Sequence, residues 1–471
     1  PDKPAVKIPD NSQILASVEN AKTAELRARA EETINKSLIQ QAPKPGKIAK
    51  TGKNELLGTT EWTLSNGVKI IIKPTKFKQD EILMAAYSDG GLSKVADVAD
   101  LPSGMLAAGI VANNGLAGFS QTELNKILTG KIANVSPFIS SYEEGFNGNS
   151  SVSDFETMLQ LVYLYFTAPR KDDNAYAALM NNYRAGLANS DSDPRKAFSD
   201  SVGVMLTNHN ARNVLINLKT LDKIDQEKAL GIFRERFAVP ADFTFVFTGN
   251  INPENDSIKK AVSTYLGGLK SKKLVEKYTD NNIRKPLGKT NNYFGREMKV
   301  KKASNFIVYS ASLPYNMTNR TLVTAIGSIL NIRYLETIRE KEGGSYGVGV
   351  RGGVNNIPVD EATLMMQFDT DPQKQAKLME IIHSEIAEIV SNGPRADDVQ
   401  KVKENMLKKY AEDLNENGWW SNAVQRYYRD KLNLVTDYKP SVEAMTAGSI
   451  RLTLKDIVNQ GNTIEVVMKP E

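Results

Sequence analysis

The sequence predicts an α+β protein built from two homologous domains, each a largely antiparallel sheet covered by helices. Three observations support this fold class. The chain of 471 residues is longer than one hydrophobic core normally organises. Strand-like and helix-like segments occur in blocks, without the strict alternation of a parallel α/β fold. One order of elements also occurs twice along the chain, which indicates a duplicated domain.

The repeat is marked by a short motif, Pro-Arg-x-Asp-Asp, at residues 169–173 and again at 394–398. In both places an apolar helix precedes the motif and a long polar helix follows it. A strand then closes each unit, at residues 243–247 and 464–467. The same order of four features in both halves favours duplication over a chance match of one motif.

The remaining elements follow from local patterns. Asn66-Gly67 between two alternating apolar runs is typical of a β-hairpin with a type I′ turn. Apolar residues at three- and four-residue steps indicate helices, and alternation indicates strands. We expect strands within residues 62–72, 82–87, 132–140 and 145–151, and helices at 101–111, 122–128, 154–166, 173–188, 322–338 and 373–390.

We expect three regions along the chain. Residues 1–55 form a helical linker or tether from a missing N-terminal half, because a stretch of helix-forming composition there lies between proline-rich ends. Residues 56–272 form the first domain and residues 273–471 the second. The chain begins at Pro1 without a methionine or a signal peptide, so we expect it to be a piece of a longer protein.

Composition excludes several classes of function. The chain has no cysteine, which rules out disulfides, thiolate zinc sites and cysteine nucleophiles, and this absence favours an exported, periplasmic location. The net charge of +5 is mild, and the lysine clusters lack interleaved aromatic residues, so we expect no nucleic-acid partner. No apolar run approaches the ~20 residues needed to span a bilayer.

The stretch from Ile338 to Val350 carries the strongest functional signal. An apolar helix pattern ends near Arg339, two glycines follow, and strand alternation begins at Tyr346. Arg339 and Tyr346 are therefore expected near one another. Gly347 and Gly349 would let the backbone of an extended peptide lie close to this strand, although a simple twist or bulge of the sheet explains the two glycines equally well.

Arg339 and Tyr346, in the context Arg-Glu-Lys-Glu-Gly-Gly-Ser-Tyr-Gly-Val, resemble a signature of the pitrilysin/insulinase-type zinc metallopeptidases, the inverzincin family. The signature belongs to the non-catalytic C-terminal half of these enzymes. The resemblance covers roughly residues 56–471. It implies that Arg339 and Tyr346 reach across to substrate bound at a zinc ion in the other half, as catalytic residues that stabilise the charge on the scissile carbonyl oxygen.

The zinc site of that family is His-x-x-Glu-His on a helix. By position the motif would fall in the helix at residues 101–111, which contains neither histidine nor glutamate, and the only histidines are His209 and His383. We therefore expect no metal site in this chain, zinc in the missing N-terminal half, and no activity of the fragment alone.

The resemblance thus predicts the non-catalytic half of a zinc metalloendopeptidase that hydrolyses peptides in a closed chamber. Its expected partners are the N-terminal catalytic half, on the same chain or a separate subunit, and peptide substrates. The alternative is a non-enzymatic peptide-binding or scaffold subunit of the same fold. A serine-hydrolase interpretation of Gly343-Gly344-Ser345-Tyr346-Gly347, with Asp369 and His383, is disfavoured because a charged helix precedes the serine and a strand follows it.

Overall fold

The computed structural model describes residues 9–23, 37–272, 274–341 and 347–471, and it divides into two compact units, residues 1–36 and 37–471. The described residues of the first unit include an exposed helix, α1 (Asn11–Thr23). No helix in the described part of the chain is long and apolar enough to cross a membrane. The predicted boundary between the two domains falls at Lys273, which lies outside the described residues.

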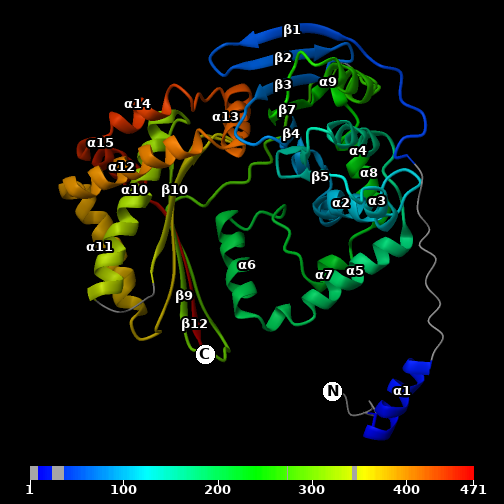
Figure 1. Ribbon diagram of the computed structural model, residues 1–471. Helices are drawn as coiled ribbons and strands as arrows, with labels where there is room; N and C mark the ends of the chain where they lie inside the picture. The colour runs from blue at the N-terminus through cyan, green and yellow to red at the C-terminus, as the bar shows by residue number, and fades with distance from the viewer. Residues whose placement is uncertain (1–8, 24–36, 273, 342–346) are drawn as a thin grey trace. The chain divides into compact units, whose positions relative to one another are not determined.

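The first sheet has seven strands in the order β1-β2-β3-β7-β4-β6-β5 (Figure 1). Neighbouring strands are antiparallel, apart from the parallel pair β3–β7. The strands are β1 (Ile48–Asn54), β2 (Thr59–Leu64), β3 (Lys69–Pro74), β4 (Ile82–Asp89), β5 (Ala133–Ile139), β6 (Glu143–Ser150) and β7 (Thr244–Gly249).

Strand β1 differs from the expectation for this region, which was a linker through residue 55. It pairs with β2 along its whole length and forms an edge of the sheet. Nearly all of its side chains are exposed, so the strand buries no apolar face. An edge strand of this kind leaves no alternating pattern in the sequence, because alternation arises from burial of one face.

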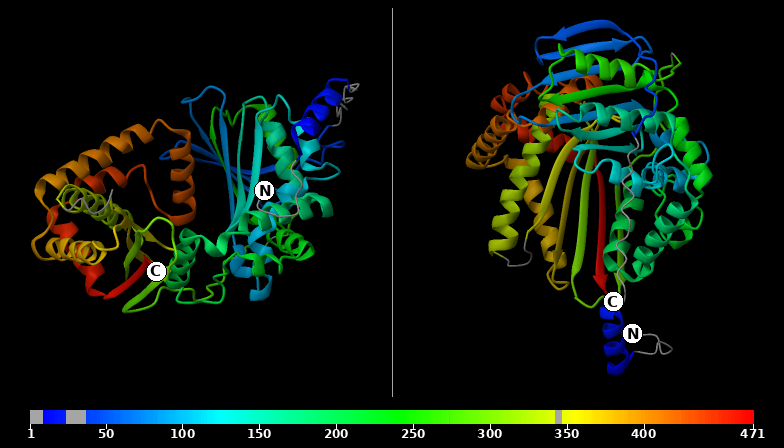
Figure 2. Two further views of the ribbon diagram at one scale, coloured as in Figure 1. Left: turned by 90° about the horizontal axis from the view of Figure 1, so that it is seen from below. Right: turned by 45° about the vertical axis from the view of Figure 1, so that its right-hand side comes forward.

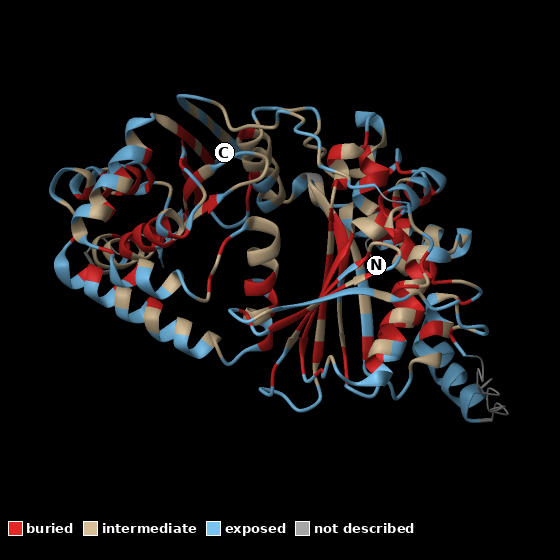
Figure 3. Ribbon diagram, turned by 90° about the horizontal axis from the view of Figure 1, so that it is seen from above, coloured by how far each residue is buried: buried red, intermediate tan, exposed pale blue. Residues whose placement is uncertain are grey.

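Helices cover one face of this sheet: α2 (Leu101–Asn114), α3 (Gln121–Ile127), α4 (Phe155–Thr167), α5 (Asp173–Leu187), α7 (Leu218–Leu221), α8 (Gln226–Arg236) and α9 (Asp256–Ala261). A group of aromatic rings fills the core between them and the strands. Phe146 on β6 lies within 6.2 Å, centroid to centroid, of Phe166, Phe237 and Phe243. Buried residues gather on the strands and on the helix faces that pack against them (Figure 3).

The second sheet has five strands in the order β10-β11-β9-β12-β8, with one parallel pair, β12–β8. The strands are β8 (Lys289–Arg296), β9 (Ala303–Ser312), β10 (Gly349–Asn355), β11 (Glu361–Thr370) and β12 (Asn462–Pro470). The helices of this half are α10 (Met317–Tyr334), α11 (Gln375–Asn392), α12 (Ala396–Asp413), α13 (Asn417–Asp430), α14 (Tyr438–Glu443) and α15 (Ala447–Asn459).

The two sheets repeat one topology. The order β3-β7-β4-β6-β5 in the first matches β8-β12-β9-β11-β10 in the second, and the parallel pair occupies the same place in both. The predicted fold class, two similar α+β domains with largely antiparallel sheets, is confirmed.

The halves exchange one helix each. Helix α6 (Pro194–Leu206), from the first half, packs on β12 and β8 of the five-stranded sheet. Helix α13 packs on β7, β4 and β3 of the seven-stranded sheet (Figure 2, left). Each follows the long polar helix after the Pro-Arg-x-Asp-Asp motif, so the exchange is reciprocal. Each sheet therefore has its own helices on one face and a helix of the other half on the opposite face (Figure 1).

Candidate functional site

Arg339 lies where the sequence placed it, at the end of a long helix. Helix α10 continues as a π-helix, Leu335–Lys341, and Arg339 is exposed on it. Tyr346 lies outside the described residues. π-Helical turns are frequent at functional sites, because the extra residue per turn redirects the side chains that follow.

A buried anchor fixes the position of this helix end. Tyr334, the last residue of α10, is fully buried, and its hydroxyl donates a hydrogen bond to the carbonyl oxygen of Ile382 on α11 at 3.0 Å. Ile338, one turn later and one residue before Arg339, is also fully buried. The backbone that carries Arg339 is therefore held against α11 from both turns.

Ion pairs reinforce the same helix end. Arg395 donates two hydrogen bonds to the carboxylate of Glu336, at 2.8 and 2.9 Å, and two more to Asp398. The hydrogen bonds from Arg395 hold the pKa of Glu336 below its usual value. One turn earlier, Arg333 pairs with Glu385 of α11 at 2.8 Å. The second copy of the Pro-Arg-x-Asp-Asp motif thus connects α12 to the helix that carries Arg339. The sequence showed that the motif is repeated, but it did not show this structural role.

Asn331 joins α10 to the strand that follows the glycines. Its side-chain oxygen accepts the N–H of Val350, and its amide nitrogen donates to the carbonyl of Val350, both at 2.9 Å. This pair of bonds fixes the start of β10 beside α10. Sequence reasoning missed Asn331, because an asparagine inside a helix carries no signal for a partner 19 residues away.

The glycines of β10, and Gly347 just before it, differ in what surrounds them. A Cβ on Gly352 would lie 2.0 Å from the carbonyl oxygen of Val323, so glycine is required there for α10 to approach the strand. Gly347 and Gly349 are exposed, and added side chains would meet nothing within 4 Å at Gly347 and only a backbone oxygen at 3.8 Å at Gly349. The predicted binding glycines therefore border open space.

A cavity of 530 Å³ lies over this open face. Gly349 and Arg351 of β10, Gln367 of β11 and Phe306 of β9 line it, and Asn331 closes it at the helix side. In the described part of the chain β10 pairs with no strand other than β11, and on its outer edge Asn331 bonds the N–H and the carbonyl of Val350. The site therefore combines a strand edge that no second strand covers with a cavity beside two small residues.

Helix α2 does not carry the residues of a zinc site. Helix α2 lies where the family motif would fall, and its sequence contains no histidine or glutamate. Within residues 9–23, 37–272, 274–341 and 347–471, no three His, Cys, Asp or Glu side chains are placed to hold a metal ion. Of the two histidines, His383 bonds Tyr309 through Nδ1 at 2.7 Å and Glu465 through Nε2 at 2.9 Å, and His209 lies in a turn with φ 56°.

The serine-hydrolase interpretation gains no support from the described residues. Ser345 lies outside them. Asp369 accepts hydrogen bonds from Ser304 and Lys302, both at 2.6 Å, and His383 has the partners given above. The acid and the base that the interpretation requires are thus engaged with other groups.

Comparison with known proteins relates the chain to peptidases. Residues 228–406 match the Peptidase M16 inactive domain. The chain is 25% identical over 444 residues to "Zinc protease PQQL-like" of Arabidopsis thaliana, covering 90% of this chain and 43% of that protein. It is 23% identical over 357 residues to "Probable zinc protease PqqL" of Escherichia coli, covering 74% and 37%. The chain therefore spans less than half the length of these curated relatives.

Solved structures agree on the fold. The periplasmic protease PqqL of Escherichia coli superposes with a TM-score of 0.80 at 19% identity, over 98% of this chain and 51% of that one. A peptidase M16 inactive domain from Pseudomonas fluorescens gives 0.69 at 16% identity, over 88% of this chain and 98% of that one. The predicted resemblance to the non-catalytic half of the pitrilysin-type M16 peptidases is confirmed by the match of residues 228–406 to the inactive domain and by the similarity to the zinc protease relatives.

Proposed function

We propose that this chain is the non-catalytic half of a zinc-dependent metalloendopeptidase and that it contributes Arg339 and Tyr346 to peptide hydrolysis in a closed chamber. The zinc ion, held by the catalytic half, supplies the activated water and polarises the scissile carbonyl. The location follows that of the Escherichia coli relative, so we also propose export to the periplasm.

One observation carries the proposal: the helix that bears Arg339 is anchored rigidly beside an open strand edge. Glu336, Ile338 and Tyr334 fix the helix, and Asn331 fixes β10 against it. A preplaced donor stabilises developing charge without reorganising during the reaction, and its loss costs ~10²–10³ in rate. The proposed role requires Arg339 to lie beside Gly347 and Gly349, and the anchoring of its helix against α11 and β10 supports it.

The strand edge suits the substrate. An extended peptide can add to β10 through main-chain hydrogen bonds at positions other than Val350, whose backbone groups Asn331 holds, and such bonds bind any sequence and leave side chains to confer specificity. Gly347 and Gly349 leave room for the peptide backbone on the open face. We propose these two glycines as substrate-binding positions.

The test uses the intact protein with both halves. Tyr346→Phe and Arg339→Lys each remove one directed donor, and we expect kcat to fall by ~10²–10³ with zinc content unchanged. Tyr183→Phe, on α5 of the first half, is the matched control. Full turnover in both site variants would refute the roles of Arg339 and Tyr346.

A second experiment addresses the strand. Gly349→Val places a branched side chain in the cavity of 530 Å³. Gly353→Val is the control, because it places the same side chain on β10 at a residue that does not line this cavity. Neither added Cβ meets an atom closer than 3.8 Å, so we expect both variants to fold. Peptide binding should weaken about tenfold in Gly349→Val alone, measured as KM. Equal KM values would exclude a peptide at this strand.

The alternative is a non-enzymatic peptide-binding or scaffold subunit of the same fold. One observation supports it: a solved peptidase M16 inactive domain from Pseudomonas fluorescens aligns over 98% of its own chain and 88% of this one. Chelation separates the two functions. Loss of peptide cleavage with a chelator supports the peptidase, and peptide binding without any cleavage supports the alternative.

A further inference from the structure

The five-stranded sheet has an uncovered strip beside helix α6. One cross-strand row runs through Gly349, Gln367, Phe306 and Val466. At the α6 end of this row, Phe306 and Val466 are buried against Phe198 of α6. At the other end, Gly349 and Gln367 are exposed. Helix α6 is therefore one wall of a strip whose floor is β11 and whose far side is β10.

Three cavities that share lining residues follow one another along the strip and together form the trough. The cavity of 530 Å³ at β10 shares Phe306, Gln367 and Asp369 with a second cavity of 330 Å³ beneath the N-terminal end of α6. That second cavity shares Arg195 and Lys302 with a third, of 930 Å³, between α6 and residues 296–302. The trough thus leads from the glycines of β10 to the start of α6.

The lining suits an extended peptide. Apolar side chains form part of the floor, namely Phe306, Phe198 and Met298, each less than a tenth exposed. Polar groups such as Gln367 and Ser304 lie between them. A groove with an apolar floor and spaced hydrogen-bonding groups is the usual form of a site for a flexible ligand.

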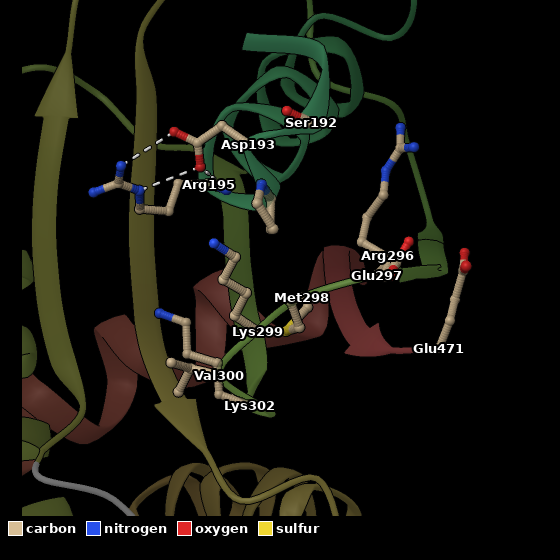
Figure 4. A pocket seen from close by; sticks show the side chains of 11 residues that line it. Ser192, Asp193, Arg195, Arg296, Glu297, Met298, Lys299, Val300, Lys302 and Glu471 are labelled. Atoms are coloured by element: carbon tan, nitrogen blue, oxygen red, sulfur yellow. Dashed lines mark hydrogen bonds and ion pairs between the residues drawn. The ribbon is translucent and has the colours of Figure 1, made fainter. Parts of the chain in front are cut away.

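Charged side chains of both signs line the end of the trough at α6, namely Arg195, Arg296, Lys299 and Lys302 together with Asp193, Glu297 and Glu471 (Figure 4). Lys299 and Lys302 extend toward the side of the cavity where Arg195 lies. Arg195 pairs with Asp193 at 3.1 Å, and Lys302 pairs with Asp369 at 2.6 Å. For Lys299 the described residues provide no ion-pair partner.

Each of these cations keeps donors for a ligand. Arg195 uses Nε and Nη2 on Asp193, so Nη1 remains, and a lysine ammonium has three donors of which Lys302 spends one on Asp369. A carboxylate entering here would meet hydrogen-bond donors from three side chains. The four cationic side chains of this cavity exceed its three carboxylates by one positive charge, and that excess disfavours an entering lysine or arginine relative to an acidic side chain.

We propose that this trough holds the segment of a substrate peptide next to the scissile bond, and that Arg195, Lys299 and Lys302 select peptides with an acidic side chain in that segment. The proposal rests on the proposed function and adds a substrate class to it. It also gives the first half, which lacks zinc ligands, a direct part in substrate choice through Arg195.

The experiment measures cleavage of one neutral peptide and of variants with Glu, Ala or Lys at successive positions beside the scissile bond, by the intact two-half protein. We expect one position at which Glu exceeds Ala in kcat/KM by about 3- to 5-fold, with Lys below Ala. The preference should weaken in about 0.5 M salt, because the charges are largely exposed.

A charge reversal supplies the sharper test. Lys299→Glu, in an exposed loop, should remove or invert the Glu preference, whereas Lys455→Glu on exposed α15 should preserve it. A Glu-to-Ala ratio of one at every position, with the neutral peptide cleaved normally, would overturn this proposal alone. Failure of the intact protein to cleave any peptide would overturn the proposed function and this proposal with it.

Discussion

A buried carboxyl group in the first half, Glu144, makes a quantitative prediction about stability. Glu144 lies on β6 with no exposed surface, and its Oε2 accepts the N–H of Gly91 at 2.5 Å. Its Oε1 has no hydrogen-bond partner among the described residues. Burial raises the pKa of Glu144 from 4.5 to about 8, against the opposing effects of the Gly91 N–H and of Arg236.

The sign of the pH effect follows from proton counting. Between pH 4.5 and 8 the unfolded chain has released the proton of Glu144, whereas the folded chain keeps it. Unfolding therefore releases a proton, and the free energy of unfolding falls as pH rises through this window. One proton corresponds to a slope of about 1.4 kcal/mol per pH unit, so the full loss by pH 8 is about 5 kcal/mol.

The assay compares the native protein with Glu144→Gln by urea denaturation at several pH values between about 5 and 8. The glutamine side chain of the variant does not titrate, so the difference in unfolding free energy between the two proteins should change by about 1.4 kcal/mol per pH unit in favour of the variant as pH rises. Glu380→Gln, an exposed position of α11, is the control and should leave the pH profile unchanged. Parallel profiles for Glu144→Gln and the native protein would refute the raised pKa.

Three further variants test contacts that hold the exchanged helices α6 and α13, each by urea denaturation of the intact protein. Asp430→Asn should cost about 3 kcal/mol, because the buried Asp430 carboxylate is an ion-pair partner of Arg429. Asn417→Ala should cost about 2 kcal/mol, since the buried Asn417 accepts a hydrogen bond from Thr75 in the other half. Phe198→Ala should cost about 3 kcal/mol by opening a cavity under α6. Unchanged stability in any variant would contradict the corresponding contact.

The sequence predicted the duplicated fold well because its signals are local. The Asn66-Gly67 turn, the apolar helix periodicity and the repeated Pro-Arg-x-Asp-Asp motif each arise within a few residues. The exposed edge strand β1 has no such signal, and its residues were therefore predicted to belong to the linker of residues 1–55. The exchange of α6 and α13 was equally invisible, because a helix has the same apolar face whichever sheet it covers.

The candidate site likewise contains residues that local patterns predict and residues that they do not. Arg339, Gly347 and Gly349 follow from the helix-to-strand pattern around them, and their roles stay predictions. The residues that fix them are distant in sequence: Arg395 reaches Glu336 across 59 positions. Such pairs depend on how helices pack, and packing is not encoded in any single window of sequence.

The reciprocal exchange of helices changes how the first half should be understood. Because α2 carries no zinc ligands, this half could be regarded as a spacer that only connects the tether to the domain that bears Arg339. Yet its helix α6 buries Phe306 and Val308 of the second sheet and forms a wall of the trough beside β10. Removing the first half would expose that apolar face and delete Arg195, so the surface offered to a peptide exists only when both halves are folded together.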